Sequence, residues 1–130
     1  MDRREIRTDQ APAAVGPYSQ AIRTGPFVHT AGQIALDPGG GGLVGSSAAE
    51  QAERALRNLA AVLAAAGSSM DRVVKVNLYL TDLAAFGEVN ETYRRFFPGP
   101  APARSCVEVR ALPKGALVMV DAVALAGEGD

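Results

Sequence analysis

The sequence is poor in residues that cross-link small proteins or bind metals: its 130 residues include one cysteine, one histidine and no tryptophan. The lone Cys106 cannot form an intramolecular disulfide, and with a single histidine it cannot supply a zinc cluster. No apolar run approaches the roughly 20 residues of a membrane-spanning helix. The charged residues 1–5 lack the apolar segment of a signal peptide. We therefore expect no metal, no membrane association and a cytoplasmic location.

An excess of one charge is also absent, because 13 Lys and Arg oppose 14 Asp and Glu to give a net charge of −1. Proteins that track nucleic-acid phosphates usually carry a basic excess, so a nucleic-acid partner is not expected. With 48% hydrophobic and 21% charged residues, the composition is globular and excludes intrinsic disorder. The length suits one domain with a real core and is too short for two ordinary domains, so residues 1–130 are interpreted as a single domain.

A first helix is predicted from the capping pattern of Ser47 and Glu50, whose side chains can satisfy each other's free backbone amides. Apolar residues then recur at helical spacing through residues 52–66. Gly67 is placed to end this helix, because glycine is the residue that most often follows a helix terminus.

A second helix is predicted to begin with Asp82 as its N-cap and to stop at Pro98. Its apolar stripe starts with Phe86 and contains one polar residue, Asn90, one turn further on. A side-chain amide that points inward must find hydrogen-bonding partners, so Asn90 is a candidate for orienting a loop or a ligand as well as for a structural role.

The other patterned segments indicate strands, at residues 27–33, 73–80, 104–109 and 117–125, with shorter ones near Ile6 and Ala21. Residues 37–42 contain four successive glycines and are interpreted as a flexible hairpin tip. Two helices separated by strands favour an α+β fold in which both helices cover one face of a sheet.

Alternation along the last strand divides its side chains into two rows. One row suits the face under the helices: Val118, Val120, Ala122 and Ala124. The other row contains Met119 and is too apolar to face water comfortably. In the preceding strand we assign Arg104 and Cys106 to that same uncovered face. We therefore expect another subunit to cover it, and any site built from Arg104 and Met119 to lie at a subunit boundary.

Arg104 is the first candidate for chemistry, because a guanidinium in a cleft can hold a carboxylate through two parallel hydrogen bonds. The competing interpretation, favoured by spacing alone, is a structural ion pair with a neighbouring acid such as Glu108. Cys106 faces the same way as Arg104 and is either a small buried hydrophobe or half of a Cys/His pair with His29. Tyr18, in a Gly-Pro-Tyr-Ser-Gln turn, either donates a hydrogen bond into a pocket or packs.

Taken together, the segments resemble the RidA/YjgF family of enamine/imine deaminases over nearly the whole chain. The matching pieces are Ala11-Pro12, Gly16-Pro17-Tyr18-Ser19-Gln20-Ala21, Ala31-Gly32-Gln33-Ile34, Asn58-Leu59, Val73-Val74-Lys75, Val89-Asn90-Glu91-Thr92-Tyr93, Phe96-Phe97, residues 102–109 and Leu112-Pro113-Lys114. The resemblance implies a chorismate-mutase-like α+β fold with a mixed sheet, assembled as a homotrimer with a central barrel and with active sites between subunits.

The resemblance also implies an activity, the hydrolysis of 2-aminoacrylate and related 2-imino acids to 2-oxo acids and ammonia without a metal or organic cofactor. Arg104 is then expected to hold the substrate carboxylate, with Tyr18 as the second catalytic candidate. The other expected substrate contacts are Asn90, Cys106, Thr30, Ala31, Gly32 and Met119.

Two positions depart from the family pattern. Met119 stands where the family has the glutamate that activates the attacking water, and Ala31 replaces the usual serine or threonine, although Thr30 is adjacent. A thioether cannot accept a proton, and general acid–base help is typically worth about 10²–10⁴ in rate. Asp121 lies on the same side of the strand, but it matches an acid that the family has in addition to the missing one.

Three hypotheses therefore remain open. The first is an imine/enamine deaminase with reduced or shifted activity. The second is a family member that does not hydrolyse its ligand and acts on another unsaturated or keto acid intermediate in a specialised pathway. The third is a carboxylate-binding or chaperone-like trimer without turnover.

Overall fold

The structure, a computed structural model, describes residues 2–127 as six strands and two α-helices. The strands are β1 Arg4–Ile6, β2 Ala21–Thr24, β3 Phe27–Thr30, β4 Val73–Leu80, β5 Ala103–Glu108 and β6 Val118–Leu125. The helices are α1 Ala48–Ala65 and α2 Phe86–Phe96. These bounds confirm the α+β class and place every predicted strand within a few residues of its expected position.

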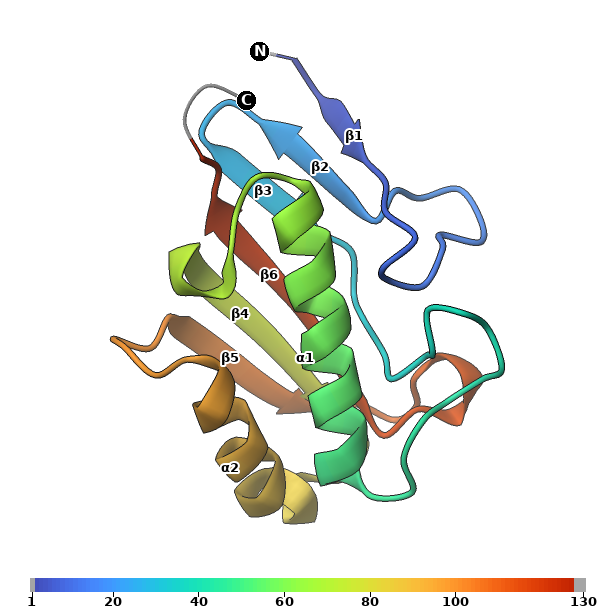
Figure 1. The fold of residues 1–130 in the computed structure, drawn as a ribbon. Coiled ribbons are helices and arrows are strands. Elements are labelled where there is room, and N and C mark those ends of the chain that lie inside the picture. Colours follow the sequence, from blue (N-terminus) through green and yellow to red (C-terminus); the bar gives the residue numbers. More distant parts are fainter. Residues whose placement is uncertain (1, 128–130) are drawn as a thin grey trace.

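The six strands form one mixed sheet in the order β1-β2-β3-β6-β4-β5. Only β4 and β5 are parallel, because α2 lies between them in the chain and returns it to the same end of the sheet. All other neighbouring strands are antiparallel. Both helices pack on the same face, with α1 across the middle of the sheet and α2 beside β5 (Figure 1). The sheet therefore has one face covered by helices and one face without a helix.

Helix α1 begins and ends as its sequence predicts. Ser47 accepts a hydrogen bond from the Glu50 amide, and the Glu50 carboxylate accepts from the Ser47 amide, so the capping box is complete. After the helix, Gly67 has a φ of 78° and the Ser68 amide reaches back to the Leu63 carbonyl at 2.8 Å. Glycine adopts this left-handed conformation without the steric cost of a Cβ, which lets the chain turn away.

The start of the second helix differs from the prediction. Asp82 does act as a cap, but its carboxylate accepts from the Ala84 amide in a short 3-10 turn, Leu83–Ala85. The α-helix proper starts at Phe86. Tight turns of this kind are common at helix N-termini, because they satisfy the first free amides before regular bonding begins.

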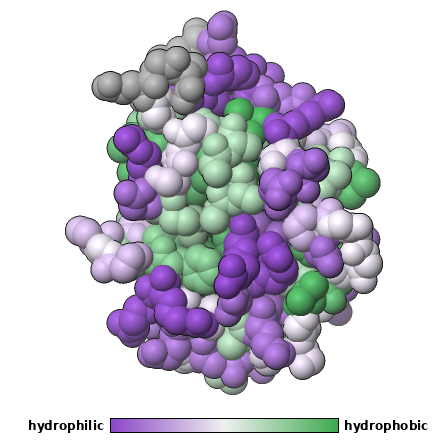
Figure 2. Space-filling view, in the orientation of Figure 1, coloured by the Kyte–Doolittle hydropathy of each residue, from purple (hydrophilic) through white to green (hydrophobic). Residues whose placement is uncertain are grey.

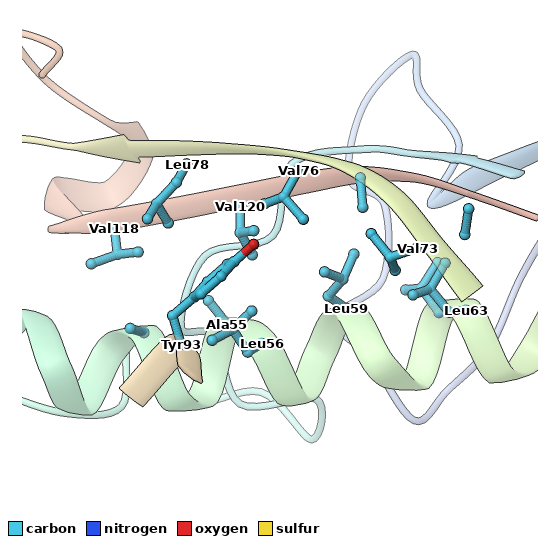
Figure 3. Close-up of a cluster of buried hydrophobic side chains, with 14 of the residues drawn as sticks. Ala55, Leu56, Leu59, Leu63, Val73, Val76, Leu78, Tyr93, Val118 and Val120 are labelled. Atoms are coloured by element: carbon cyan, nitrogen blue, oxygen red, sulfur yellow. The ribbon is translucent and has the colours of Figure 1, made fainter. Parts of the chain in front are cut away.

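The core lies between α1 and the strands (Figure 3). Leu56, Leu59 and Leu63 of α1 pack on the β4 and β6 side chains that point toward the helices, all of them almost fully buried. The β6 side chains in this layer are the predicted row, Val118, Val120, Ala122 and Ala124. Tyr93 reaches from α2 into the same layer (Figure 3). At about 1.5–3 kcal/mol for each large apolar side chain, this layer is the main source of stability.

The assignment of Arg104 to the uncovered face is wrong. In the sheet register Arg104 pairs with Val76 and Cys106 pairs with Leu78, and both β4 partners are buried under the helices. Paired residues share a face, so Arg104 and Cys106 point toward the helices. The prediction erred because alternation gives two rows but does not say which row faces inward, and the apolar Val107 suggested the wrong one. Val107 is in fact 46% exposed on the other face.

The face without helices carries Met119 and Asp121, as predicted from β6. Phe27 and Leu125 pair on this face and remain 40% and 39% exposed. Figure 2 views the molecule from the helix side, where hydrophilic residues surround a pale apolar area. No helix in the described part of the chain combines the length and apolar character needed to cross a membrane.

Replacing Ser47 by alanine is expected to lower the free energy of unfolding by about 1 kcal/mol, because the Glu50 amide loses its acceptor. Urea unfolding followed by circular dichroism measures this change. Replacing Ser46, whose hydroxyl donates only to the exposed Glu50 carboxylate, is the matched control and should cost less. Equal midpoints for wild type and Ser47→Ala would show that the cap does not stabilise the helix.

Candidate functional site

Arg104 is held by three side chains of α2. Its Nη1 donates a 2.9 Å hydrogen bond to Oδ1 of Asn90. Its guanidinium carbon lies 4.7 Å from the centroid of the Tyr93 ring and 5.3 Å from that of Phe86. These three residues lie at intervals of four and three along the helix, so they share one helical face. The polar residue on the predicted apolar stripe, Asn90, is thus the hydrogen-bonding partner of the arginine.

Arg104 forms no ion pair with any carboxylate of the described residues. Glu108, the acid proposed as its structural partner, instead accepts a 2.9 Å hydrogen bond from the Leu83 amide. The guanidinium has five N–H donors, and one asparagine oxygen occupies only one direction. The remaining donors are therefore available to an external anion, which removes the main support for the structural interpretation.

A cavity of about 620 Å³ lies beside this arginine, lined by Arg104, Asn90, Tyr93 and the turn of residues 97–102. Cys106 follows Arg104 on the same face and packs against the core. Burial raises the pKa of the Cys106 thiol above its ordinary value, and the positive charge of Arg104 opposes this rise. We call Arg104, Asn90 and Cys106, with the two aromatic rings, the arginine half-site.

The other predicted residues gather elsewhere. Tyr18, Ala31, Gly32 and Met119 line a second cavity, of about 520 Å³. Its walls come from loops that gather beyond the end of the sheet, away from α2 (Figure 1). Thr30 lines an adjoining hollow of about 420 Å³ with Tyr18 and Ala31, and its hydroxyl accepts a 3.0 Å bond from the Ala122 amide. We call the residues around the second cavity the methionine half-site.

Met119 is pressed against the backbone of Gly32. A Cβ built on Gly32 would lie 2.6 Å from the Met119 sulfur and 3.0 Å from its Cγ. No side chain larger than hydrogen fits at position 32 while Met119 keeps its place. The two residues therefore form one surface of the cavity, with the thioether as its apolar part.

Asp121 is not free to replace the missing acid. One carboxylate oxygen accepts a 2.8 Å bond from Asn77 and the other a 3.0 Å bond from the Tyr79 hydroxyl. Burial and this bond to Asp121 raise the pKa of Tyr79. Asp121 also does not line the cavity of Met119.

The suggested pairing of Cys106 with His29 is not formed within the chain. His29 pairs with Val123 on the face without helices, whereas Cys106 points toward the helices on β5. Strands β6 and β4 separate β3 from β5. Within the described residues, no group of three or more His, Cys, Asp and Glu side chains is placed to hold a metal ion.

Three buried amides support the methionine half-site and were missed as a group in the sequence. Gln20 donates to the carbonyls of residues 8 and 12, Asn58 donates to those of Ile34 and Leu36, and Gln51 joins Gly45 to the amide of Leu117. These bonds tie down irregular segments outside the six strands, in addition to the isolated bridges of Gln33 with Val120 and of Leu36 with Leu43. The available signal was an amide at an otherwise apolar helix position, as at Asn58.

The two half-sites lie on opposite faces of the sheet. Arg104 shares the face of Val76, while Met119 pairs with Tyr79 on the other face. A single ligand cannot contact both side chains within one chain, because the sheet itself lies between them. Both can contribute to one site only if each comes from a different copy of the chain.

Comparison with known proteins gives consistent matches along the chain. The sequence model of the family described as Endoribonuclease L-PSP matches residues 8–126. The mouse 2-iminobutanoate/2-iminopropanoate deaminase is 45% identical over 125 residues, which cover 96% of this chain and 93% of that protein.

Solved structures agree. The crystal structure of RidA from an Antarctic Psychrobacter has a TM-score of 0.91 and 43% identity, covering 95% of this chain and 99% of that one. Escherichia coli TdcF, solved with bound serine, has a TM-score of 0.90 and 36% identity, covering 95% and 99%.

The raised pKa of Cys106 predicts slow alkylation by iodoacetamide at neutral pH. The rate should increase with pH, and the pH at which it reaches half its maximum should be higher than for a free cysteine peptide. In Arg104→Met the midpoint should move higher still, because the charge that favours the thiolate is gone. Mass spectrometry of samples quenched across a pH series measures both midpoints. A wild-type midpoint at or below that of the peptide would contradict the buried thiol.

Proposed function

From the premise that this chain belongs to the RidA/YjgF family, we propose that it is an imine deaminase that hydrolyses 2-imino acids, including the product of 2-aminoacrylate, to 2-oxo acids and ammonia. The observation that carries the proposal is Arg104: a guanidinium fixed on two aromatic faces, without a carboxylate partner among the described residues and beside a cavity. The carboxylate of a small acid can accept hydrogen bonds from the guanidinium N–H groups of Arg104 that Asn90 does not occupy. The names of the mouse relative and of the serine-bound TdcF structure support a small amino-acid-derived ligand.

The proposed role of Arg104 is to fix the carboxylate and therefore the adjacent C2 atom. The contacts of its guanidinium with the Tyr93 and Phe86 rings and the bond to Asn90 restrict where the guanidinium can lie. An arginine held in this way binds a carboxylate through two parallel bonds without first losing side-chain freedom. The positive charge also withdraws electrons from the reacting carbon of the bound acid.

The proposed reaction is an addition followed by an elimination. An enamine substrate first takes a proton at C3 and becomes the iminium. Water then forms a bond to C2 as the C=N π electrons move to nitrogen, and a proton passes from the water to that nitrogen. The C–N bond breaks, ammonia leaves, and the hydroxyl loses its proton to give the 2-oxo acid and ammonium in total.

We propose that the complete site forms between protomers of a homotrimer, with the arginine half-site of one chain facing the methionine half-site of another. The opposite placement of Arg104 and Met119 supports this arrangement. So does the exposed apolar surface of Phe27, Val107 and Leu125 on the sheet face without helices, since a bare apolar face favours association. The expected cytoplasmic location stays a prediction.

A second candidate function rests on Met119. The cavity that contains it is lined by no carboxylate, and Asp121 is held by Asn77 and Tyr79. No carboxylate or imidazole lines that cavity, so neither kind of base is placed there to take a proton from water. The alternative is therefore that Arg104 holds an unsaturated or keto acid that this protein binds or converts without hydrolysis.

The deciding experiment generates imines in situ with an amino acid oxidase and follows their loss in competition with semicarbazide. Wild type is expected to accelerate hydrolysis, and Arg104→Ala should lower kcat/KM about 100-fold, since a charge-assisted contact to the carboxylate is lost. Arg104→Lys keeps the charge without the planar fork and should fall between the two. Arg95→Ala removes an exposed arginine of α2 that bonds Glu53, and it should leave the rate unchanged.

Met119→Glu separates the two candidate functions. Acceleration by wild type supports the deaminase, and a further rise in Met119→Glu would show that the native site works without its full acid–base help. If wild type does not accelerate imine hydrolysis but Met119→Glu does, hydrolysis is not the native reaction. If neither wild type nor Met119→Glu accelerates hydrolysis, and a 2-oxo acid still binds in a way that depends on Arg104, the protein is a binding protein.

Mixing two inactive variants tests the shared site. Arg104→Ala removes the guanidinium of one half-site, and Gly32→Val alters the other because its side chain fits only if Met119 shifts. When the two are refolded together, about a quarter of the sites in a cyclic trimer should combine two intact halves. Activity near that fraction supports a site between chains, whereas activity no greater than the sum of the separate variants places each site within one chain.

A further inference from the structure

A second arginine lines the cavity of the arginine half-site. Arg94 of α2 borders the same cavity as Arg104 of β5, together with Asn90 and Tyr93. No aspartate or glutamate is among the described residues that line it. A cavity whose charged groups all have one sign attracts ions of the opposite sign. The two guanidinium groups therefore favour an anion with two negative charges over an anion with one.

The spacing of the two arginines is set within one chain. Arg94 follows Asn90 by four residues, so the two side chains project from the same face of α2, one turn apart. The Arg104 guanidinium donates to Asn90 at 2.9 Å and therefore lies beside the earlier of these two turns. One helical turn rises about 5.4 Å. An acid with two or three carbons between its carboxylates can bridge such a spacing, since the Arg94 side chain is long and unbranched.

Arg94 has one ion pair among the described residues, and this pair is loose. Glu91 lies 3.6 Å from its Nη2, which is longer than a hydrogen bond, and Glu91 does not line the cavity. The next residue, Arg95, instead donates to Glu53 of α1 and does not border the cavity. Of these two successive arginines, only Arg94 is placed to meet a ligand of Arg104.

The rest of the cavity wall offers few groups that could hold an anion. The turn of residues 97–102 contains three prolines, which have no backbone N–H, and its other residues carry no polar side chain. Proline also fixes φ, so this wall of the cavity is stiff. The charged groups available to an anion at this wall are therefore Arg94 and Arg104.

We propose that Arg94 binds a second carboxylate of the substrate, and that the protein prefers imines derived from dicarboxylic amino acids, such as glutamate, over monocarboxylic imines of the same length. This inference rests on the proposed function, in which Arg104 holds the carboxylate next to the reacting carbon. Arg94 does not touch the reacting atoms and is a specificity-determining residue. A contact between an arginine and a carboxylate near solvent contributes up to about fivefold in binding, which sets the size of the expected preference.

The test compares two imines of equal carbon number under the semicarbazide competition. Glutamate and norvaline give five-carbon imines that differ at C5, which is a carboxylate in one and a methyl group in the other. Wild type is expected to show a kcat/KM about fivefold higher for the glutamate-derived imine, and Arg94→Ala should bring this ratio toward one. Arg95→Ala removes the same charge from the next position and should keep the wild-type ratio.

Binding provides a second readout that does not depend on turnover. Calorimetry should give a dissociation constant about fivefold lower for 2-oxoglutarate than for 2-oxopentanoate, and Arg94→Ala should remove the difference. Retained binding of 2-oxopentanoate shows that Arg94→Ala is folded. If no imine is hydrolysed faster, the proposed deaminase fails, while the binding ratio still decides the role of Arg94.

Three results would overturn the inference. The first is equal binding of the two oxo acids, or equal or better use of the norvaline-derived imine. The second is a preference for the dicarboxylic ligand that Arg94→Ala leaves unchanged or that Arg95→Ala removes equally. The third is loss of the preference in Lys114→Ala alone, because Lys114 lines the other cavity and would place the second carboxylate in the methionine half-site.

Discussion

The site depends on one cation that the fold orients but does not neutralise. A guanidinium at the edge of a core normally finds a carboxylate, because a partly buried charge is costly without a partner. Here Phe86 and Tyr93 contact its faces, and Asn90 supplies a neutral acceptor. These contacts fix Arg104 in place and leave its charge to an incoming anion. The acid that could have paired with it, Glu108, is instead engaged by the Leu83 amide.

That orientation follows from the topology of the sheet. Because α2 links β4 to the parallel strand β5, the helix returns directly over the side chains that β5 directs toward the core. The same alternation that sends Arg104 under α2 sends Met119 of β6 to the other face. In the proposed function the chain therefore carries two halves of a site that it cannot join by itself, and its uncovered apolar sheet face favours contact with a second copy. The proposed site and the proposed association then both follow from the topology of the sheet.

Much of this architecture is readable from the sequence, and the failures are specific. The pattern of Ser47 and Glu50 predicts the start of helix α1. The side chains that β6 directs to each face of the sheet follow from alternation alone. The facing of β5 was not readable, because it depends on a register with a strand far away in sequence, and the apolar Val107 pointed to the wrong answer. The resemblance named the residues of both halves, but it did not show that Arg104 and Met119 lie on opposite faces. The cavity walls were hidden for another reason: they are irregular loops whose positions are set by hydrogen bonds from buried amides such as Asn58.

In the proposed function, the change to Met119 removes proton transfer without preventing the addition of water. An iminium carbon next to a bound carboxylate is already electrophilic, so a placed water adds to it without full deprotonation, and fixing the two reactants supplies much of the barrier reduction. A carboxylate at position 119 would contribute proton transfer but would also need water around it, since an unpaired charge in an apolar cavity is costly. The thioether gives up the proton transfer and leaves the cavity of Met119 without a carboxylate in its lining.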